Sequence, residues 1–122
     1  GSGLSKRSFI YIDDASVATY LISIKGKVGN TYHISTNKII SIKNLVKMIS
    51  KITKTKFEKL VNVTQDRIGK DASYNLDSKK IRKELNWKPK INLNEGLIKT
   101  LKWADDNVAF LKHQKFQYIH KK

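Results

Sequence analysis

Apolar residues recur along most of this chain with the periods of strands and helices. Residues 7–12 are rich in β-forming side chains and predict a strand. Asp13-Asp14 predicts the N-cap of a helix over residues 15–24, which Lys25-Gly26 ends. Residues 31–35 predict a second, shorter strand.

Helical periodicity is clearest in two later segments. Ser41 precedes a run typical of a capped amphipathic helix, whose apolar face carries Ile42, Leu45, Val46, Ile49 and Ile52. Asn92 followed by Glu95 is a capping-box variant and predicts the start of a further helix. That helix is expected to bury Leu97, Leu101, Ala104 and Val108.

The segments between these helices complete the predicted order. Residues 57–63 predict a third strand, and Asp77 predicts the N-cap of a short helix. Trp87-Lys88-Pro89 ends that helix, because proline disfavours helical geometry at the residue before it. The order β-α-β-α-β-α-α, without an internal repeat, predicts an α/β layered, α+β-like small domain.

Length and composition limit the classes of protein that this chain can represent. With 122 residues and no cysteine, it predicts one domain without disulfides or thiolate metal sites. No apolar run reaches the roughly 18 residues that span a bilayer, and no signal peptide is visible, so a cytoplasmic location is expected. Gly1-Ser2-Gly3 is typical of an expression-tag remnant, so residues 1–6 are assigned to a linker and 108–122 to a basic tail.

The net charge of +15 raises the possibility of a nucleic-acid or other polyanion partner. However, the basic residues are 22 Lys and only 3 Arg, whereas phosphate and base recognition often uses the planar fork of Arg. The lysines are also spread over the whole chain, which favours a solvated surface. Nucleic-acid binding is therefore kept as an alternative.

One charged loop is a candidate binding site. In residues 66–71, Arg67 and Lys70 flank Gly69, which allows a turn and the close approach of a ligand. Two cations across such a turn suit a diphosphate. A solvated turn in which Arg67 pairs with Asp66 or Asp71 explains the same residues.

Other polar residues give weaker indications. Arg7 could reach a phosphate from the start of its strand or simply lie exposed there, and helix capping already explains Ser41. The three scattered histidines lack acidic neighbours, so no metal site is predicted. The chain also has no Gly-x-x-Gly-x-x-Gly turn for a dinucleotide. A Tyr-x-x-x-Lys spacing occurs only at Tyr118, which is interpreted as coincidence, so no catalytic residue is assigned.

Five segments together resemble the C-terminal part of extended short-chain dehydrogenase/reductases, most closely the dTDP-glucose 4,6-dehydratases. Residues 7–14 resemble the family's Arg-x-aromatic-x-Tyr-Val-x-Asp strand, and residues 29–34 its Gly-x-x-Tyr-Asn-Ile-Gly strand. Residues 66–71 resemble Asp-Arg-Pro-Gly-His-Asp, and residues 74–89 the segment that ends in Gly-Trp-x-Pro. Residues 95–100 resemble the start of the terminal helix, so the match covers residues 7–107 in the family's order.

The resemblance implies that residues 7–107 are the substrate-binding portion of a nucleotide-sugar 4,6-dehydratase. Arg7 and Arg67 then correspond to the arginines that bind the substrate diphosphate. Lys70 stands where the family has a histidine at the phosphates, and Ser41 approximately matches an Asn that opens the long helix. Because Ser35 and Asn86 replace glycines and His33 replaces Asn, the nucleotide and sugar stay open. Epimerases and decarboxylases use the same scaffold and remain alternatives.

In that family NAD and the catalytic residues lie upstream of the matched region. The resemblance therefore implies that the full-length parent uses NAD, whereas this chain neither binds NAD nor catalyses the reaction alone. The family's strand that corresponds to residues 31–35 lies at the edge of the cofactor-domain sheet. A missing or separate Rossmann domain is thus an expected partner, together with a nucleotide-diphosphate sugar.

Overall fold

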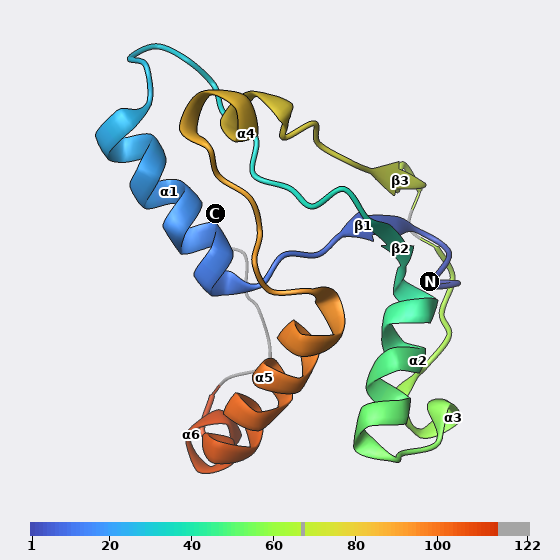
Figure 1. Ribbon diagram of the computed structural model, residues 1–122. Coiled ribbons are helices and arrows are strands. Elements are labelled where there is room, and N and C mark those ends of the chain that lie inside the picture. The colour runs from blue at the N-terminus through green and yellow to red at the C-terminus, as the bar shows by residue number, and fades with distance from the viewer. Residues whose placement is uncertain (67, 115–122) are drawn as a thin grey trace.

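The computed structural model describes residues 1–66 and 68–114 and has an α/β architecture, as predicted from the sequence (Figure 1). Three short strands and six helices occur within these residues. Their order is β1 (Lys6–Ser8), α1 (Ile12–Lys25), β2 (Ile39–Ser41), α2 (Ile42–Thr53), α3 (Phe57–Leu60), β3 (Ser73–Tyr74), α4 (Lys79–Leu85), α5 (Leu93–Asp106) and α6 (Val108–Lys112). In this part of the chain, no helix has the length and apolar character needed to cross a bilayer.

The sheet is small and mixed, with the strand order β2-β1-β3. β1 pairs with β2 in antiparallel fashion, with Arg7 opposite Ile40. On its other side β1 pairs in parallel with β3, where Arg7 stands opposite Tyr74. The first strand is therefore central and is held by segments that follow it much later in the chain.

The buried core lies where α1 packs against α4, at the upper left of Figure 1. Ala18 of α1, Ile81 of α4 and Trp87 form its centre. They are surrounded by the partly buried residues Ile10, Leu21, Ile22, Tyr32, Ile34 and Leu85. Ala18 is small enough for the two helices to approach closely. The remaining helices, α2, α3, α5 and α6, lie in the lower half of Figure 1.

Two helix starts agree with the cap residues predicted from the sequence. The Ser41 hydroxyl accepts a hydrogen bond from the Asn44 amide at 3.2 Å, and α2 begins at the next residue. The Asn92 side chain likewise accepts from the Glu95 amide at 3.0 Å at the start of α5. Both caps satisfy amides that the first turn of a helix leaves without partners.

The predicted strands were wrong in extent or position. The strand expected over residues 7–12 covers only Lys6–Ser8, because the chain then turns toward the core and enters α1 at Ile12. Residues 31–35 form no strand: Tyr32 and Ile34 pack on the core, but no described strand pairs with their backbone. Residues 57–63 were also wrong, since α3 covers Phe57–Leu60 and irregular structure follows.

Two predicted caps and one buried position were also wrong. Asp13 and Asp14 do not cap α1, because the helix begins earlier, after Tyr11, and places both in its first turn. α4 begins at Lys79 with Ser78 in the cap position, although the Asp77 carboxylate accepts from the Lys79 amide at 2.8 Å. Val108 starts the separate helix α6 and is 49% exposed.

A network of hydroxyl groups joins β1 to the segment after α1. Ser8 Oγ lies 2.7 Å from Thr36 Oγ1 and accepts from the Ser35 hydroxyl at 3.1 Å and from the Thr36 amide at 3.1 Å. Ser35 is only 4% exposed, and its carbonyl accepts from Ser78 Oγ at 3.0 Å and from Arg82 Nη2 at 3.1 Å. The network therefore links β1 to α4 through polar groups inside the fold.

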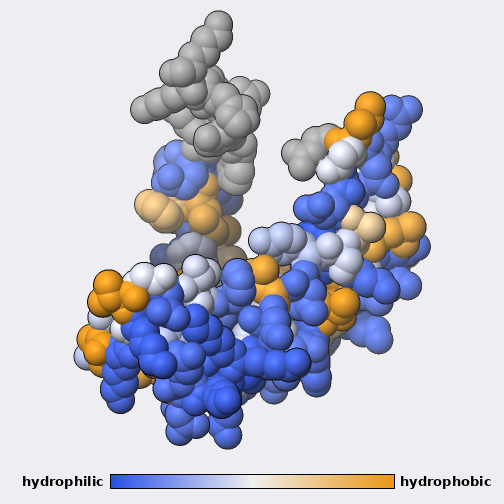
Figure 2. All heavy atoms as spheres, turned by 90° about the horizontal axis from the view of Figure 1, so that it is seen from above, coloured by the Kyte–Doolittle hydropathy of each residue, from blue (hydrophilic) through white to orange (hydrophobic). Residues whose placement is uncertain are grey.

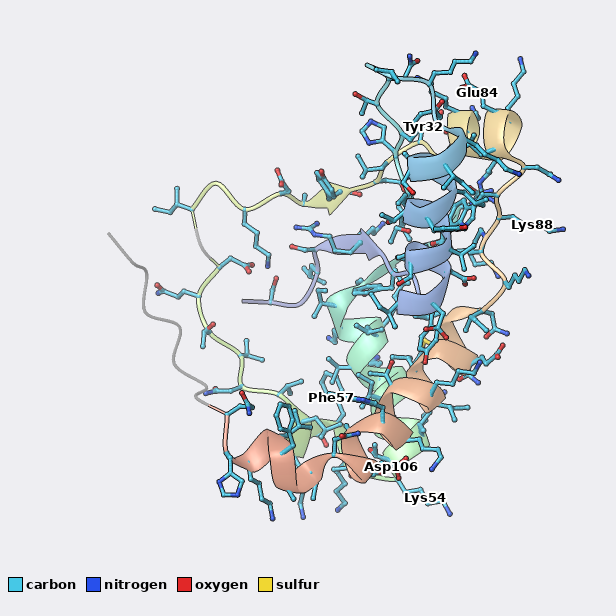
Figure 3. The ribbon with its side chains drawn as sticks, turned by 90° about the vertical axis from the view of Figure 1, so that its left-hand side faces the viewer. Tyr32, Lys54, Phe57, Glu84, Lys88 and Asp106 are labelled. Atoms are coloured by element: carbon cyan, nitrogen blue, oxygen red, sulfur yellow. The ribbon has the colours of Figure 1, made fainter. Side chains whose placement is uncertain are left out.

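Tyr32 connects the same irregular segment to α4, as the upper part of Figure 3 shows. Its hydroxyl donates to Glu84 Oε2 at 2.8 Å and accepts from the Lys27 amide at 3.1 Å. The Lys80 ammonium lies over its ring, 4.7 Å from the centroid. These side-chain bonds hold a segment that has no strand partner among the described residues.

Candidate diphosphate site

The sheet brings the start of the chain to the candidate loop. Arg7 is half-buried in β1, and its Nη2 donates to the Asp71 carbonyl oxygen at 3.2 Å. Its Nη1 donates to the Lys6 carbonyl at 2.7 Å, and the Lys6 amide donates to the Ala72 carbonyl at 2.9 Å. Arg7 therefore lies at the end of the 66–71 loop, as the diphosphate hypothesis requires. Within residues 1–66 and 68–114, no carboxylate forms an ion pair with Arg7.

The loop turns at Gly69, whose φ of +73° lies in the left-handed region. A side chain at this position would strain the backbone, and glycine adopts this conformation freely. The turn allows Lys70 to fold back on Asp66, with Lys70 Nζ 2.6 Å from Asp66 Oδ1. The turn thus places the Lys70 ammonium beside Asp66, at the start of the loop.

The environment of Asp66 is strongly cationic and donor-rich. Its Oδ2 accepts from the Ser2 hydroxyl at 2.7 Å and its Oδ1 from the Ser2 amide at 3.1 Å. The Lys70 ammonium and then the Ser2 hydroxyl lower the pKa of Asp66 from 3.8 to about 2. Asp66 is consequently ionised throughout the neutral range.

A cavity of about 310 Å³ opens between this loop and the residues before β1. It is lined by Ser2, Leu4, Ser5, Asp66, Gly69, Lys70 and Ala72. Polar groups and backbone from two distant parts of the sequence thus surround one space. Arg7 and Ser41 do not line it, so of the three predicted site residues that the structure describes, the cavity includes Lys70 alone.

Ser41 lies close to Arg7 in the sheet, because Lys6 is the register partner of Ser41 and Arg7 that of Ile40. Its side chain is half-buried, and its hydroxyl is already engaged as the cap of α2. The structure therefore explains Ser41 by helix capping. A role in binding substrate stays a prediction.

Arg67 lies outside the described residues, so its predicted role at the phosphates rests on the sequence resemblance. Its neighbours Asp66 and Ile68 are described, and Ile68 is 99% exposed. The described residues contain no group of three or more His, Asp or Glu that could hold a metal ion. His33 is exposed on the irregular segment after α1.

The sequence interpretation did not include Ser2 or the Asp71 carbonyl among the site residues. Ser2 was set aside with residues 1–6 as a tag remnant, but the structure places it directly on Asp66. Gly3 also contributes, since its carbonyl accepts from the Lys43 amide of α2 at 2.9 Å. The pairing of β1 with β3 brings the start of the chain to the loop, and local sequence patterns carry no signal for it.

One known protein family matches most of this chain. Residues 1–100 match the family described as GDP-mannose 4,6 dehydratase. The chain belongs to this family. The match begins at the first residue, so it includes Ser2 and Gly3 as well as Arg7, Ser41, Arg67 and Lys70.

Individual relatives and solved structures extend the comparison. The dTDP-glucose 4,6-dehydratase of Haemophilus influenzae is 33% identical over 113 residues, which cover 84% of this chain and 33% of that protein. The crystal structure of DesIV, a dTDP-glucose 4,6-dehydratase from Streptomyces venezuelae with NAD and TYD bound, has a TM-score of 0.84 and 27% identity, covering 90% of this chain and 34% of that one. UDP-glucose 4-epimerase from Thermotoga maritima with UDP-glucose gives a TM-score of 0.79 and 29% identity, covering 88% and 34%.

This chain therefore spans about a third of the length of the relatives that it matches. The solved structures share the fold of almost the whole described chain. The resemblance to extended short-chain dehydrogenase/reductases is confirmed by these comparisons.

Proposed function

We propose that this chain binds the diphosphate of a nucleotide sugar as the substrate-binding part of a nucleotide-sugar 4,6-dehydratase. The observation that carries the proposal is the 3.2 Å hydrogen bond from the Arg7 guanidinium to the Asp71 carbonyl. It joins the strand arginine to the loop that contains Arg67 and Lys70. Residues that are 60 or more positions apart in sequence thus meet where a diphosphate needs several cations.

The chemistry of these side chains supports a diphosphate ligand. Arg presents a planar fork of donors that can bind two phosphate oxygens, whereas Lys contributes a compact charge. Arg7 donates only to neutral backbone carbonyls in the described structure, so its charge is available to an anion. Lys70 keeps 26% of its side chain exposed and lines the cavity.

The relatives favour a dTDP-sugar as the ligand, since the matched enzymes include dTDP-glucose 4,6-dehydratases. The epimerase whose structure contains UDP-glucose favours a UDP-sugar instead and supports the alternative of an epimerase. The four residues proposed here address the diphosphate, which both ligands share. The base and the sugar are therefore to be distinguished by experiment.

The residues of this chain do not fit NAD. A dinucleotide site needs a glycine-rich turn that leads from a strand into a helix. Gly26 and Gly29 have the spacing of the first two glycines of that turn, but Tyr32 stands at the third position. They also follow the end of α1 and do not open a helix. In this proposal NAD binds to the part of the full-length protein that lies outside the region covered by this chain.

That unmatched part is also the proposed partner of α1. Several large apolar side chains of α1 are at least half exposed: Ile12, Val17, Tyr20 and Ile24. Val17, Tyr20 and Ile24 follow helical spacing and so share one face. The relatives are about three times as long as this chain, and the part of them that this chain does not match is the proposed cover of the face.

Substitution Tyr20→Glu should abolish binding of a separately produced cofactor domain without lowering the melting temperature. A fall in melting temperature, or retained binding, would refute this assignment.

Calorimetry with dTDP tests the diphosphate site. The wild-type chain should bind dTDP, and both Arg67→Ala and Arg7→Ala should remove most of that binding. Lys83→Ala is a matched control, because Lys83 is exposed on α4 and its loss changes the net charge equally. dTDP binding that survives Arg67→Ala would contradict the assigned site. Titration with UDP under the same conditions distinguishes the two nucleotide classes.

Nucleic acid is the competing anionic partner, since the charge of +15 would support it. Such binding would fall steeply with added salt and would not depend on Arg67. Figure 2 shows that hydrophilic side chains cover most of the face seen from above, with apolar residues in separate patches. The lysines are spread along the whole sequence, and we favour the diphosphate over a polyanion for this reason.

A further inference from the structure

Asp66 is the one carboxylate among the residues that line the loop cavity. It is bound from two sides, by Lys70 Nζ at 2.6 Å and by the Ser2 hydroxyl and amide at 2.7 and 3.1 Å. A negative charge at this place would repel the phosphates that the same loop is proposed to bind. Asp66 is therefore expected to have a role other than direct contact with the phosphates.

The two partners of Asp66, Ser2 and Lys70, differ in how easily a ligand can displace them. Ser2 is joined to Asp66 by a hydroxyl and an amide and precedes Gly3, which is itself bonded to α2. Lys70 is held by one partly exposed ion pair, and ion pairs near the surface contribute little to stability. An anionic ligand can therefore compete for Lys70 while Ser2 keeps its hold on Asp66.

We propose that Asp66 is a positioning residue that holds Lys70 in the unliganded loop and yields it to the ligand's diphosphate. Ser2 fixes Asp66 in both states. When phosphate oxygens enter the cavity, the Lys70 ammonium leaves Asp66 Oδ1 and binds them. This inference rests on the proposed diphosphate function and adds to it a defined exchange of one cation between two anions.

The geometry of the loop supports this exchange. Gly69, next to Lys70, is in the left-handed conformation, and among the described residues other than its chain neighbours no atom lies within 4 Å of the position that a Cβ would take there. Lys70 can therefore be repositioned without a clash at Gly69. The far end of the loop stays fixed by the bonds from Arg7 to Asp71 and from Lys6 to Ala72.

Asp66→Asn separates the two roles of Asp66. The amide oxygen of Asn can still accept from Ser2, but the neutral side chain no longer competes for Lys70. We expect dTDP to bind this variant about two- to five-fold more tightly than the wild type, which corresponds to the strength of an exposed ion pair. Ser2→Ala should instead weaken dTDP binding, because it leaves Asp66 and the loop less firmly placed.

Asp106→Asn is the matched control. Asp106 also pairs with a lysine four positions away, Lys102 at 3.0 Å on α5, in a more exposed setting, and it is labelled near the foot of Figure 3. It removes the same charge without touching the loop, so dTDP affinity should stay at the wild-type value. In the Lys70→Met background, Asp66→Asn should tighten dTDP binding less than it does in the wild type, because only the repulsion between Asp66 and the phosphates is then removed. Inorganic pyrophosphate, titrated in parallel, should show the same order of affinities if the exchange concerns the diphosphate alone.

Each outcome decides between the two proposals. Binding of dTDP that is removed by Arg67→Ala but is unchanged or weakened by Asp66→Asn overturns the exchange and leaves the proposed function intact. Equal tightening by Asp106→Asn also overturns it, because net charge then explains the gain. Binding by Asp66→Asn but not by the wild type supports the exchange. Absence of binding in every variant overturns both proposals.

Discussion

The indole Nε1–H of Trp87 donates to the backbone carbonyl of Asp14 at 3.2 Å. The Asp14 carboxylate in turn accepts from the amides of Lys90 and Ile91, each at 2.9 Å. Asp14 is 5% exposed and Trp87 is 3% exposed, so both partners are removed from water. One residue of α1 thus fixes the chain on both sides of Pro89, where α4 gives way to α5.

Asp14→Ala is expected to destabilise the fold, because it leaves the Lys90 and Ile91 amides without their acceptor. The loss should amount to about 2–4 kcal/mol in the free energy of unfolding, since an unpaired buried polar group costs about 1–3 kcal/mol. Chemical denaturation monitored by the fluorescence of Trp87 and Trp103 and by circular dichroism measures it. Asp13→Ala is the control, because Asp13 is the exposed neighbour in the same helical turn. Equal effects of the two substitutions would contradict the assigned role of Asp14.

Ser8→Ala should weaken the hydroxyl network between β1 and the segment after α1. It removes the partner of the Thr36 amide and of the Ser35 and Thr36 hydroxyls. We expect a loss of about 1–2 kcal/mol in the free energy of unfolding. Ser16→Ala on the exposed side of α1 should change stability by less than about 0.5 kcal/mol. Similar losses in both variants would argue against a specific contribution from the network.

Asn86→Gly should stabilise the chain. Asn86 ends α4 with φ of +50°, in the left-handed region. Glycine has no steric penalty there, so a gain of a few tenths of a kcal/mol to about 1 kcal/mol is expected. Asn86→Ala should lose about 1 kcal/mol for the opposite reason. Thermal unfolding of the two variants would refute this account if alanine were tolerated as well as glycine.

Acid titration should open the contact between Asp66 and Lys70. The pKa of Asp66 is lowered to about 2, so the carboxylate form is favoured in the folded chain. The stability that this contact contributes is present above the ordinary pKa of 3.8 and is lost as the pH falls through about 2. The carboxyl carbon shift of Asp66, followed by NMR, should titrate with a midpoint near 2. Lys70→Met should move the midpoint toward 3.8, and an unshifted midpoint would show that Lys70 is not its main cause.

Sequence patterns predicted those parts of the fold whose cause is local. Ser41 and Asn92 cap their helices as expected, because a cap residue and the apolar period after it act within a single turn. Gly69 adopts the left-handed turn expected of it. The positions of the strands were predicted poorly. Residues 31–35 have strand-forming side chains, but a strand also needs a partner, and Tyr32 is held by side-chain bonds instead.

The candidate site shows the same limit. Arg7 and Lys70 are found close to one loop, as the resemblance implied, because β1 pairs with β3. The carboxylate of Asp14 was expected to cap a helix, but it binds amides more than 70 positions away, and no local pattern indicates that. Ser2 was missed because small residues at the start of a chain resemble a tag. Its role depends on Asp66, which lies 64 positions later.

The central position of β1 has a consequence for synthesis on the ribosome. Both edges of β1 can be paired only after Ser41 and then Ser73, the register partners of Lys6, have been synthesised. Contacts over such separations form slowly, since long loops must close first. The loop from Asp66 to Asp71 emerges just before the strand that docks it. The loop proposed to bind phosphate is therefore expected to become ordered only after Ser73 and Tyr74 of β3 have been translated.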